Sequence, residues 1–127
     1  FLHSLTPLHS LVLLHSLALL HSVPLQFSQS LLEKMPKMSD EEVLQRITAI
    51  RGFGTWSAQM YLMFSLGRTD VWPSGDLAVR VGFGRLLGLT ERPTPKQTDQ
   101  LASPFTPYRS ALALLCWHYY SSVPHEQ

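Results

Sequence analysis

The apolar positions from residue 28 onward recur at helical spacing and predict a series of short helices. The first follows Ser39-Asp40-Glu41-Glu42, a capping box with Ser39 as the N-cap and Glu42 as the third helical residue. Its apolar stripe consists of Val43, Leu44, Ile47 and Ile50. The second helix covers about residues 56–66, between a Thr55 cap and a Gly67 stop. Because this second helix is apolar on nearly all sides, we expect it to be buried and central.

Three later helices are predicted by equally local signals. Asp76 precedes a helix over residues 77–87 that Gly88 ends. Its expected core residues are Val79, Val81, Phe83, Leu86 and Leu87. Thr94-Pro95-Lys96-Gln97 offers a cap, a proline at the first position and a capping-box partner. Thr106-Pro107 offers a cap and a proline in the same way for a last helix that reaches about Tyr120.

No stretch of the chain alternates as a β-strand does, so the predicted fold class is all-α. We expect a bundle of five or six short helices from residue 30 onward. A length of 127 residues is that of one domain.

The first 27 residues have a different pattern. Leu-His-Ser recurs with a period of six residues, and no charged residue precedes Glu33. A six-residue step turns a helix by about 240°, and on a strand the leucines would share the face of the histidines, so neither geometry gives an amphipathic element. A secretory signal and a membrane span also fit poorly, since histidines interrupt the apolar run. We therefore expect a low-complexity leader over 1–27, either divergent, truncated or mistranslated, and one domain over 28–127.

Charge and cysteine content narrow the function only a little. A formal net charge of +1 neither supports nor excludes a nucleic-acid partner, so only the local placement of arginines is informative. The single cysteine, Cys116, lies in the apolar run 111–117 and is expected to pack as a small hydrophobic residue. A chain with one cysteine forms no internal disulfide, which fits a reducing compartment. We expect a monomer with no membrane contact.

Ile50-Arg51-Gly52-Phe53-Gly54-Thr55 joins the first two predicted helices. Two glycines one residue apart allow a tight turn whose backbone can approach a partner closely. The N–H groups of such a turn, together with the N-terminus of the next helix, form a donor site for a phosphate oxygen. The sequence therefore predicts a helical hairpin that holds one phosphate.

Asp76 has both a structural and a chemical interpretation. After Ser-Gly and before an apolar helix, an aspartate is a good N-cap. A carboxylate held by N–H donors at a helix start stays ionised near neutral pH. Such an anion stabilises a sugar that becomes oxocarbenium-like when its glycosidic bond breaks, and it orients the attacking water. The two interpretations are compatible.

The motifs IRGFGTWSA, VWPSGDLAVR and PYRSALALLCW together resemble the helix-hairpin-helix DNA glycosylase superfamily, and within it the 3-methyladenine glycosylases. The resemblance extends from about Met35 to Tyr120. It implies a helix-hairpin-helix bundle in which the usual N-terminal helices are missing or replaced by the leader. It also implies base excision repair of alkylated purines in double-stranded DNA without a cofactor, in the nucleoid of a prokaryote or the nucleus of a eukaryote.

The resemblance also implies roles for particular residues. Asp76 matches the catalytic aspartate, and Trp117 matches an aromatic residue that lines the pocket for the flipped base. Trp56 and Met60 are further pocket residues, although core packing explains all three pocket residues equally well or better. Superfamily members that cut the strand have a lysine where this chain has Trp56, so the resemblance implies a monofunctional enzyme that uses water.

The hairpin is the implied DNA contact. The backbone of Gly52, Phe53, Gly54 and Thr55 would bind one phosphate, with Arg51 beside it. The family often binds a monovalent cation through hairpin carbonyls, whereas no other metal site is predicted. Arg80 and Arg109 are further phosphate candidates or simply surface arginines.

Two alternatives to catalysis stay open at this point. A chain that keeps the hairpin but cannot flip a base would be a non-catalytic DNA-binding helix-hairpin-helix fragment. A helical protein-interaction module would use the hairpin only as a tight turn.

Overall fold

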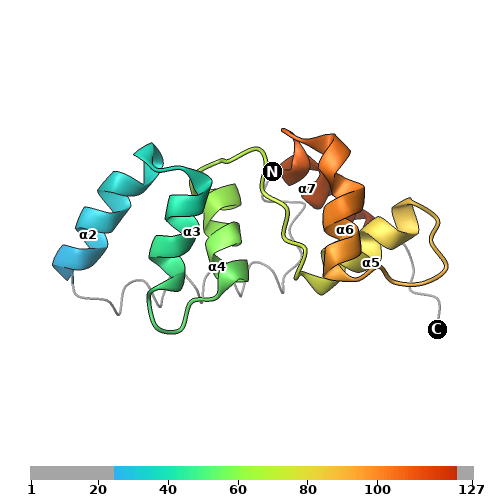
Figure 1. Cartoon of the computed structure of the whole chain (residues 1–127), viewed down its shortest axis with the longest axis horizontal. Coiled ribbons are helices and arrows are strands. Elements are labelled where there is room, and N and C mark those ends of the chain that lie inside the picture. The colour runs from blue at the N-terminus through green and yellow to red at the C-terminus, as the bar shows by residue number, and fades with distance from the viewer. Residues whose placement is uncertain (1–24, 123–127) are drawn as a thin grey trace. The chain divides into compact units, whose positions relative to one another are not determined.

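The computed structural model describes residues 25–122 (Figure 1). Every regular element in this range is a helix, which confirms the all-α prediction. Six α-helices lie in the described range, and none is long and apolar enough to cross a membrane. The repeats of the predicted leader lie outside the described residues. The first helix, α2 (Leu25–Lys34), begins three residues before the predicted domain boundary at residue 28.

The described residues form two compact units that meet in sequence at Arg68 and Thr69. The first, which we call the hairpin unit, contains α2, the short 3-10 helix η2 (Met35–Lys37), α3 (Asp40–Thr48), α4 (Thr55–Met60) and the π-helix η3 (Tyr61–Ser65). The second, which we call the carboxylate unit, contains α5 (Leu77–Leu86), α6 (Pro95–Ala102), the 3-10 helix η4 (Ser103–Phe105) and α7 (Arg109–Ser122).

In the hairpin unit, α3 begins as predicted. Ser39 Oγ accepts the Glu42 N–H at 3.2 Å and lies 3.4 Å from the Glu42 carboxylate. Val43 and Ile47 are buried on one side of α3, as their spacing predicts. The predicted second helix is divided into α4 and η3, with Gly67 beyond it at φ 65°.

The expected Thr55 cap is wrong. Gly54 takes the N-cap position in an extended conformation, and its carbonyl accepts the first helical bond from Ala58 N at 3.2 Å. Thr55 is therefore the first helical residue. An extended residue ahead of a helix satisfies the cap geometry without a side-chain bond, and glycine is accepted there.

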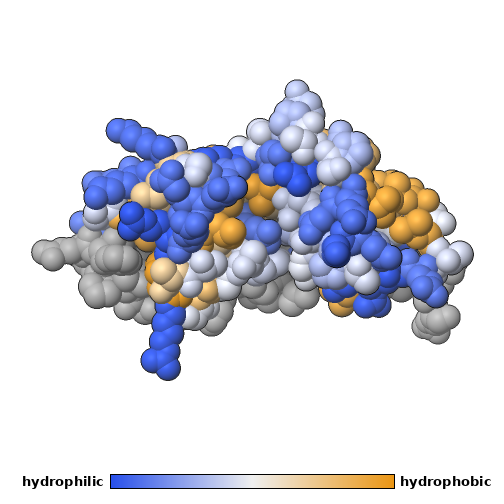
Figure 2. All heavy atoms as spheres, viewed as in Figure 1, coloured by the Kyte–Doolittle hydropathy of each residue, from blue (hydrophilic) through white to orange (hydrophobic). Residues whose placement is uncertain are grey.

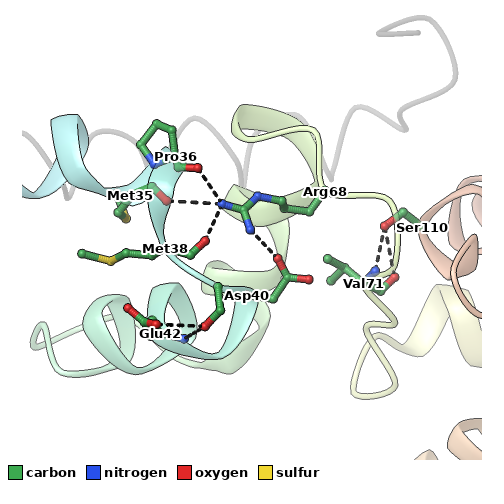
Figure 3. Close-up of polar contacts among 9 residues, drawn as sticks. Met35, Pro36, Met38, Asp40, Glu42, Arg68, Val71 and Ser110 are labelled. Atoms are coloured by element: carbon green, nitrogen blue, oxygen red, sulfur yellow. Dashed lines mark hydrogen bonds and ion pairs between the residues drawn. The ribbon is translucent and has the colours of Figure 1, made fainter.

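Arg68, the last residue of the hairpin unit, is bonded to the segment from η2 to the start of α3, a connection that the sequence did not suggest. Its Nη1 donates to Asp40 Oδ1 at 2.8 Å, and its Nη2 donates to the Met38 carbonyl at 2.8 Å (Figure 3). The carbonyls of Met35 and Pro36 lie 3.3 Å from the same nitrogen. One guanidinium thus lies within hydrogen-bond distance of carbonyls from η2 and from the residue that follows it.

In the carboxylate unit, α5 packs against α7 at a very short separation. A Cβ atom at Gly82 would overlap the carbonyl oxygen of Cys116, so only glycine allows this approach. Phe83 is fully buried and meets Trp72 edge to face, with ring centroids 5.2 Å apart. Cys116 is buried as predicted, and burial raises the pKa of its thiol to about 12, so it packs as an unreactive side chain.

Two leucines at the end of α5 depart from the prediction. Leu86 is 38% exposed and Leu87 is 44% exposed, whereas both were expected in the core. Figure 2 shows apolar surface where α5 leads into the following loop. The core face of α5 is carried instead by Val79, Gly82 and Phe83, because Gly82 allows α7 to lie on that side.

The predicted capping box of α6 is confirmed, since Thr94 Oγ1 accepts Gln97 N at 3.2 Å and Gln97 Oε1 accepts Thr94 N at 2.9 Å. The predicted start of the last helix is wrong. Thr106 and Pro107 lie in a turn closed by Tyr108 N and the Phe105 carbonyl at 2.7 Å, and α7 begins at Arg109.

Candidate active site and DNA-binding hairpin

The hairpin has the backbone geometry that its glycines predict. Gly52 has a φ of 97°, in the left-handed region that favours glycine. Phe53 is buried and its N–H donates to the Ile50 carbonyl at 3.1 Å, which closes the turn. Four of the five predicted DNA contacts are exposed, namely Arg51, Gly52, Gly54 and Thr55. The Phe53 N–H, by contrast, is engaged inside the protein.

A phosphate and a monovalent cation make different demands on this turn. The N-terminus of α4 and the exposed backbone on either side of it supply donors of the kind that hold a phosphate oxygen. The turn also carries backbone carbonyls, the ligand type that hard cations take, and a cation at the hairpin stays a prediction. Among residues 25–122, no cluster of His, Cys, Asp or Glu is placed to hold a metal.

Two predicted pocket residues lie on α4 in the hairpin unit. Trp56 is half-buried and Met60 is fully buried. Their role in a base pocket stays a prediction. No lysine lies within the hairpin, and the chain's three lysines, Lys34, Lys37 and Lys96, are at the end of α2, in η2 and at the start of α6.

Asp76 is the N-cap of α5, as predicted. Its Oδ1 accepts the Val79 N–H at 3.0 Å, and its own N–H donates to the Pro73 carbonyl at 2.9 Å. The same Oδ1 accepts the indole N–H of Trp117 on α7 at 3.2 Å. Only 7% of Asp76 is exposed. Two N–H donors thus converge on one oxygen of this buried carboxyl.

The segment that leads to Asp76 is anchored on the start of α7. Ser110 N donates to the Thr69 carbonyl at 2.9 Å. Val71 N donates to Ser110 Oγ at 2.8 Å, a contact drawn in Figure 3. Asp70 accepts Arg109 Nε at 2.8 Å and Arg109 Nη2 at 3.0 Å, a bidentate pair. These hydrogen bonds therefore hold the segment before the Asp76 turn against the start of α7.

Asp70 and Arg109 also change each other's protonation. The bond from Arg109 holds the pKa of Asp70 below its usual value, and the bond to Asp70 raises the pKa of Arg109. Arg109 was considered as a phosphate contact, whereas its guanidinium is engaged with Asp70. Sequence reasoning missed Asp70, because its partner lies 39 residues away. The only local signal was an aspartate directly before the apolar Val-Trp-Pro.

Trp117 lies in the core of the carboxylate unit, with 1% of its surface exposed. The structure thus brings two predicted site residues, Asp76 and Trp117, into direct contact. A hollow of about 460 Å³ lies along the loop before α6, and no predicted site residue lines it. It is lined by Leu89, Thr90, Glu91, Arg92, Pro93, Gln97, Gln100 and Leu101.

Known proteins resemble this chain over part of its length. No family model matches the chain. It is 38% identical to DNA-3-methyladenine glycosylase 1 of Schizosaccharomyces pombe over 85 residues, which are 67% of this chain and 37% of that protein. The chain spans about a third of the length of the curated relatives it matches.

Solved structures agree with the sequence comparison. A Schizosaccharomyces pombe 3-methyladenine DNA glycosylase in complex with abasic DNA superposes with a TM-score of 0.64 at 38% identity, covering 67% of this chain and 41% of that one. A 3-methyladenine DNA glycosylase from Archaeoglobus fulgidus gives a TM-score of 0.65 at 26% identity, covering 72% and 31%. Over about two thirds of its length, this chain is therefore homologous to the DNA-3-methyladenine glycosylases of the helix-hairpin-helix superfamily.

Proposed function

We propose that this chain is a monofunctional DNA glycosylase that removes alkylated purines, such as 3-methyladenine, from double-stranded DNA. The observation that carries the proposal is the buried Asp76 carboxylate, which caps α5 and accepts two N–H donors in a chain homologous to such enzymes. The hairpin is the proposed DNA contact, and its exposed glycine backbone supports that role. Proposed sites of action are the nucleoid of a prokaryote or the nucleus of a eukaryote.

The proposed reaction is hydrolysis of the bond between the base nitrogen and the sugar C1′. An N-alkylated purine is cationic, so it leaves as a neutral base with the electron pair of that bond. The sugar then carries positive charge, which the Asp76 anion stabilises electrostatically. Water oriented by the carboxylate adds to C1′ and loses a proton, and the product is an abasic site in an intact strand.

Trp56 supports the monofunctional assignment. A lysine at its position would attack C1′, displace the base and hold the opened sugar as an imine from which the strand breaks. An indole has no such nucleophile. We therefore propose that the enzyme makes no covalent bond to DNA.

The test is incubation of the full chain with a duplex that contains one alkylated purine, with and without borohydride. The proposal expects release of the base and strand cleavage only after alkali. A borohydride-trapped adduct, or cleavage without alkali, would show that an amine acts in place of water. Binding of the duplex without base release would favour the alternative, a non-catalytic DNA-binding fragment.

A further inference from the structure

Trp117 donates its indole N–H to the carboxylate on which the proposed function depends. The two residues are 41 positions apart, and the bond from Trp117 Nε1 to Asp76 Oδ1 is 3.2 Å long. Trp117 lies in the third turn of α7, whereas Asp76 precedes the first turn of α5. This contact therefore depends on the packing of α5 against α7 and on no local motif.

Two donors constrain a carboxylate more than one donor does. The χ2 torsion of an aspartate is broad, so a second donor restricts the plane of the carboxylate more than the bond from the Val79 backbone does alone. The Trp117 N–H comes from a different helix and reaches the same oxygen. Together the two donors fix both the position of Oδ1 and the direction in which the carboxylate faces.

Other contacts within the carboxylate unit hold α5 and the segment before it against α7. The chain ahead of Asp76 is bonded to the first residues of α7 through Asp70 and Val71, with Arg109 and Ser110 as their partners. In the middle of the pair, Gly82 lets α5 lie directly against the backbone of α7 at Cys116. The residue next to Cys116 is Trp117, so the close approach sets the place of its ring.

The burial of Trp117 limits the alternative role of stacking on a base. Stacking needs an accessible face of the ring, and 1% of Trp117 is exposed. A donor role needs no exposed face, because it acts through Asp76. The two roles differ in their chemistry, since stacking favours a cationic base whereas holding the carboxylate does not depend on the charge of the base.

We propose that Trp117 is a positioning residue that orients Asp76 for attack at the sugar, and that it acts equally on cationic and neutral bases. The catalytic consequence rests on the proposed function, whereas the donor role is a property of the fold. Trp117→Phe removes the N–H and retains an aromatic ring.

The first test measures kcat and KM of the full chain on duplexes with 7-methylguanine, a cationic lesion, or hypoxanthine, a neutral one. Trp117→Phe is expected to lower kcat by roughly tenfold to a hundredfold, the range expected for loss of one hydrogen bond to a charged group. The loss should be the same for both lesions, with KM unchanged. A loss confined to 7-methylguanine, or an unchanged kcat, overturns the proposal.

Trp72→Phe is the matched control, because Trp72 is a second buried tryptophan of the same unit and packs on Phe83. Trp72→Phe is expected to lower the melting temperature as Trp117→Phe does. It should not lower kcat on the two lesions. Equal loss of kcat in both variants would show that damage to the core explains the effect, which would overturn the positioning role.

The second test needs no activity and no folded Trp117 variant. In the full chain labelled with 15N at its indole nitrogens, Asp76→Ala should shift the Trp117 indole N–H resonance and speed its exchange with solvent, while the Trp72 resonance changes less. An unchanged Trp117 resonance overturns the proposal whether or not the chain excises bases. A chain that excises nothing overturns the proposed function instead, and the resonance still decides the donor role.

Discussion

The hairpin unit and the carboxylate unit hold their candidate functional groups by different means. The hairpin is local, since Gly52, Phe53 and Gly54 form a turn closed by one bond from Phe53 N to the Ile50 carbonyl. Asp76 depends on contacts far away in sequence, from Trp117 directly and from Arg109 and Ser110 through the preceding segment. A phosphate contact needs only exposed backbone, whereas a carboxylate that acts on one atom needs a fixed direction.

Each unit contains an arginine–aspartate pair that joins segments distant in sequence. Arg68 and Asp40 join the end of the hairpin unit to the start of α3, and Arg109 and Asp70 join the segment before Asp76 to α7. The partners are 28 residues apart in the first pair and 39 residues apart in the second. Both are partly exposed, so their value lies in the geometry they fix more than in the strength of the ion pair itself.

The largest stability effect is expected at the contact between α5 and α7. Gly82→Ala would place a methyl group on the Cys116 carbonyl and force the helices apart, which we expect to lower the free energy of unfolding by about 3 kcal/mol. Chemical denaturation measures this change. Gly75→Ala is the control, since a Cβ there meets open space and should change little. Equal stability of the two variants would contradict the close packing.

The next effect is expected in the hairpin unit. Arg68→Leu removes donors to Asp40 and to the carbonyls before α3. We expect it to lower the free energy of unfolding by about 2 kcal/mol. Arg46→Leu, at an exposed arginine of α3, is the comparison and should cost little. If both variants unfold at the same denaturant concentration, the anchoring role of Arg68 is wrong.

A smaller effect that depends on pH is expected for Asp70→Asn. At neutral pH its free energy of unfolding should fall by about 1 kcal/mol. The folded protein holds the pKa of Asp70 below its unfolded value, so the ion pair stabilises the fold above the unfolded pKa. This contribution disappears as the pH falls through the lowered pKa. The difference in melting temperature between the unmodified chain and Asp70→Asn should therefore shrink toward acid pH. A difference that grew instead would refute a stabilising ion pair between Asp70 and Arg109.

The smallest effect is expected at the hairpin. Gly54 has an ordinary φ and open space around it, so Gly54→Leu should fold normally while it blocks close approach of a phosphate. We expect duplex binding to weaken roughly threefold, to the same extent for every sequence. Fluorescence anisotropy with two unrelated duplexes measures it. Sequence-selective weakening, or none, would remove the hairpin from the DNA interface.

The sequence was most informative where structure depends on neighbouring residues. The caps at Ser39, Asp76 and Thr94 were predicted because a cap and its partner lie three residues apart. The start of α7 was missed because the pattern Thr106-Pro107 is local, whereas Asp70 engages the Arg109 N–H from 39 residues away. The exposure of Leu86 was missed for a similar reason, since the choice of core face depends on how closely α7 approaches Gly82.

The candidate site follows the same rule. Asp76 and the hairpin were found from motifs. The Asp76 cap and the left-handed conformation of Gly52 are as predicted, whereas Gly54 takes the place of Thr55 as the cap of α4 and the Phe53 N–H is bonded to Ile50. The bond from Trp117 to Asp76 is not present in either motif alone, because it requires two helices to pack. Local rules thus predict the candidate chemical groups, whereas tertiary packing sets the orientation of one of them, Asp76.

The most direct test of the account is a comparison of the full chain with Asp76→Asn under single-turnover conditions on a duplex containing one alkylated purine. Asparagine retains an oxygen that can accept the Val79 and Trp117 N–H groups, whereas the negative charge is lost. The account predicts that base release falls by roughly a hundredfold or more, while binding to the duplex is nearly unchanged. Base release by Asp76→Asn at a rate close to that of the unmodified chain would contradict it.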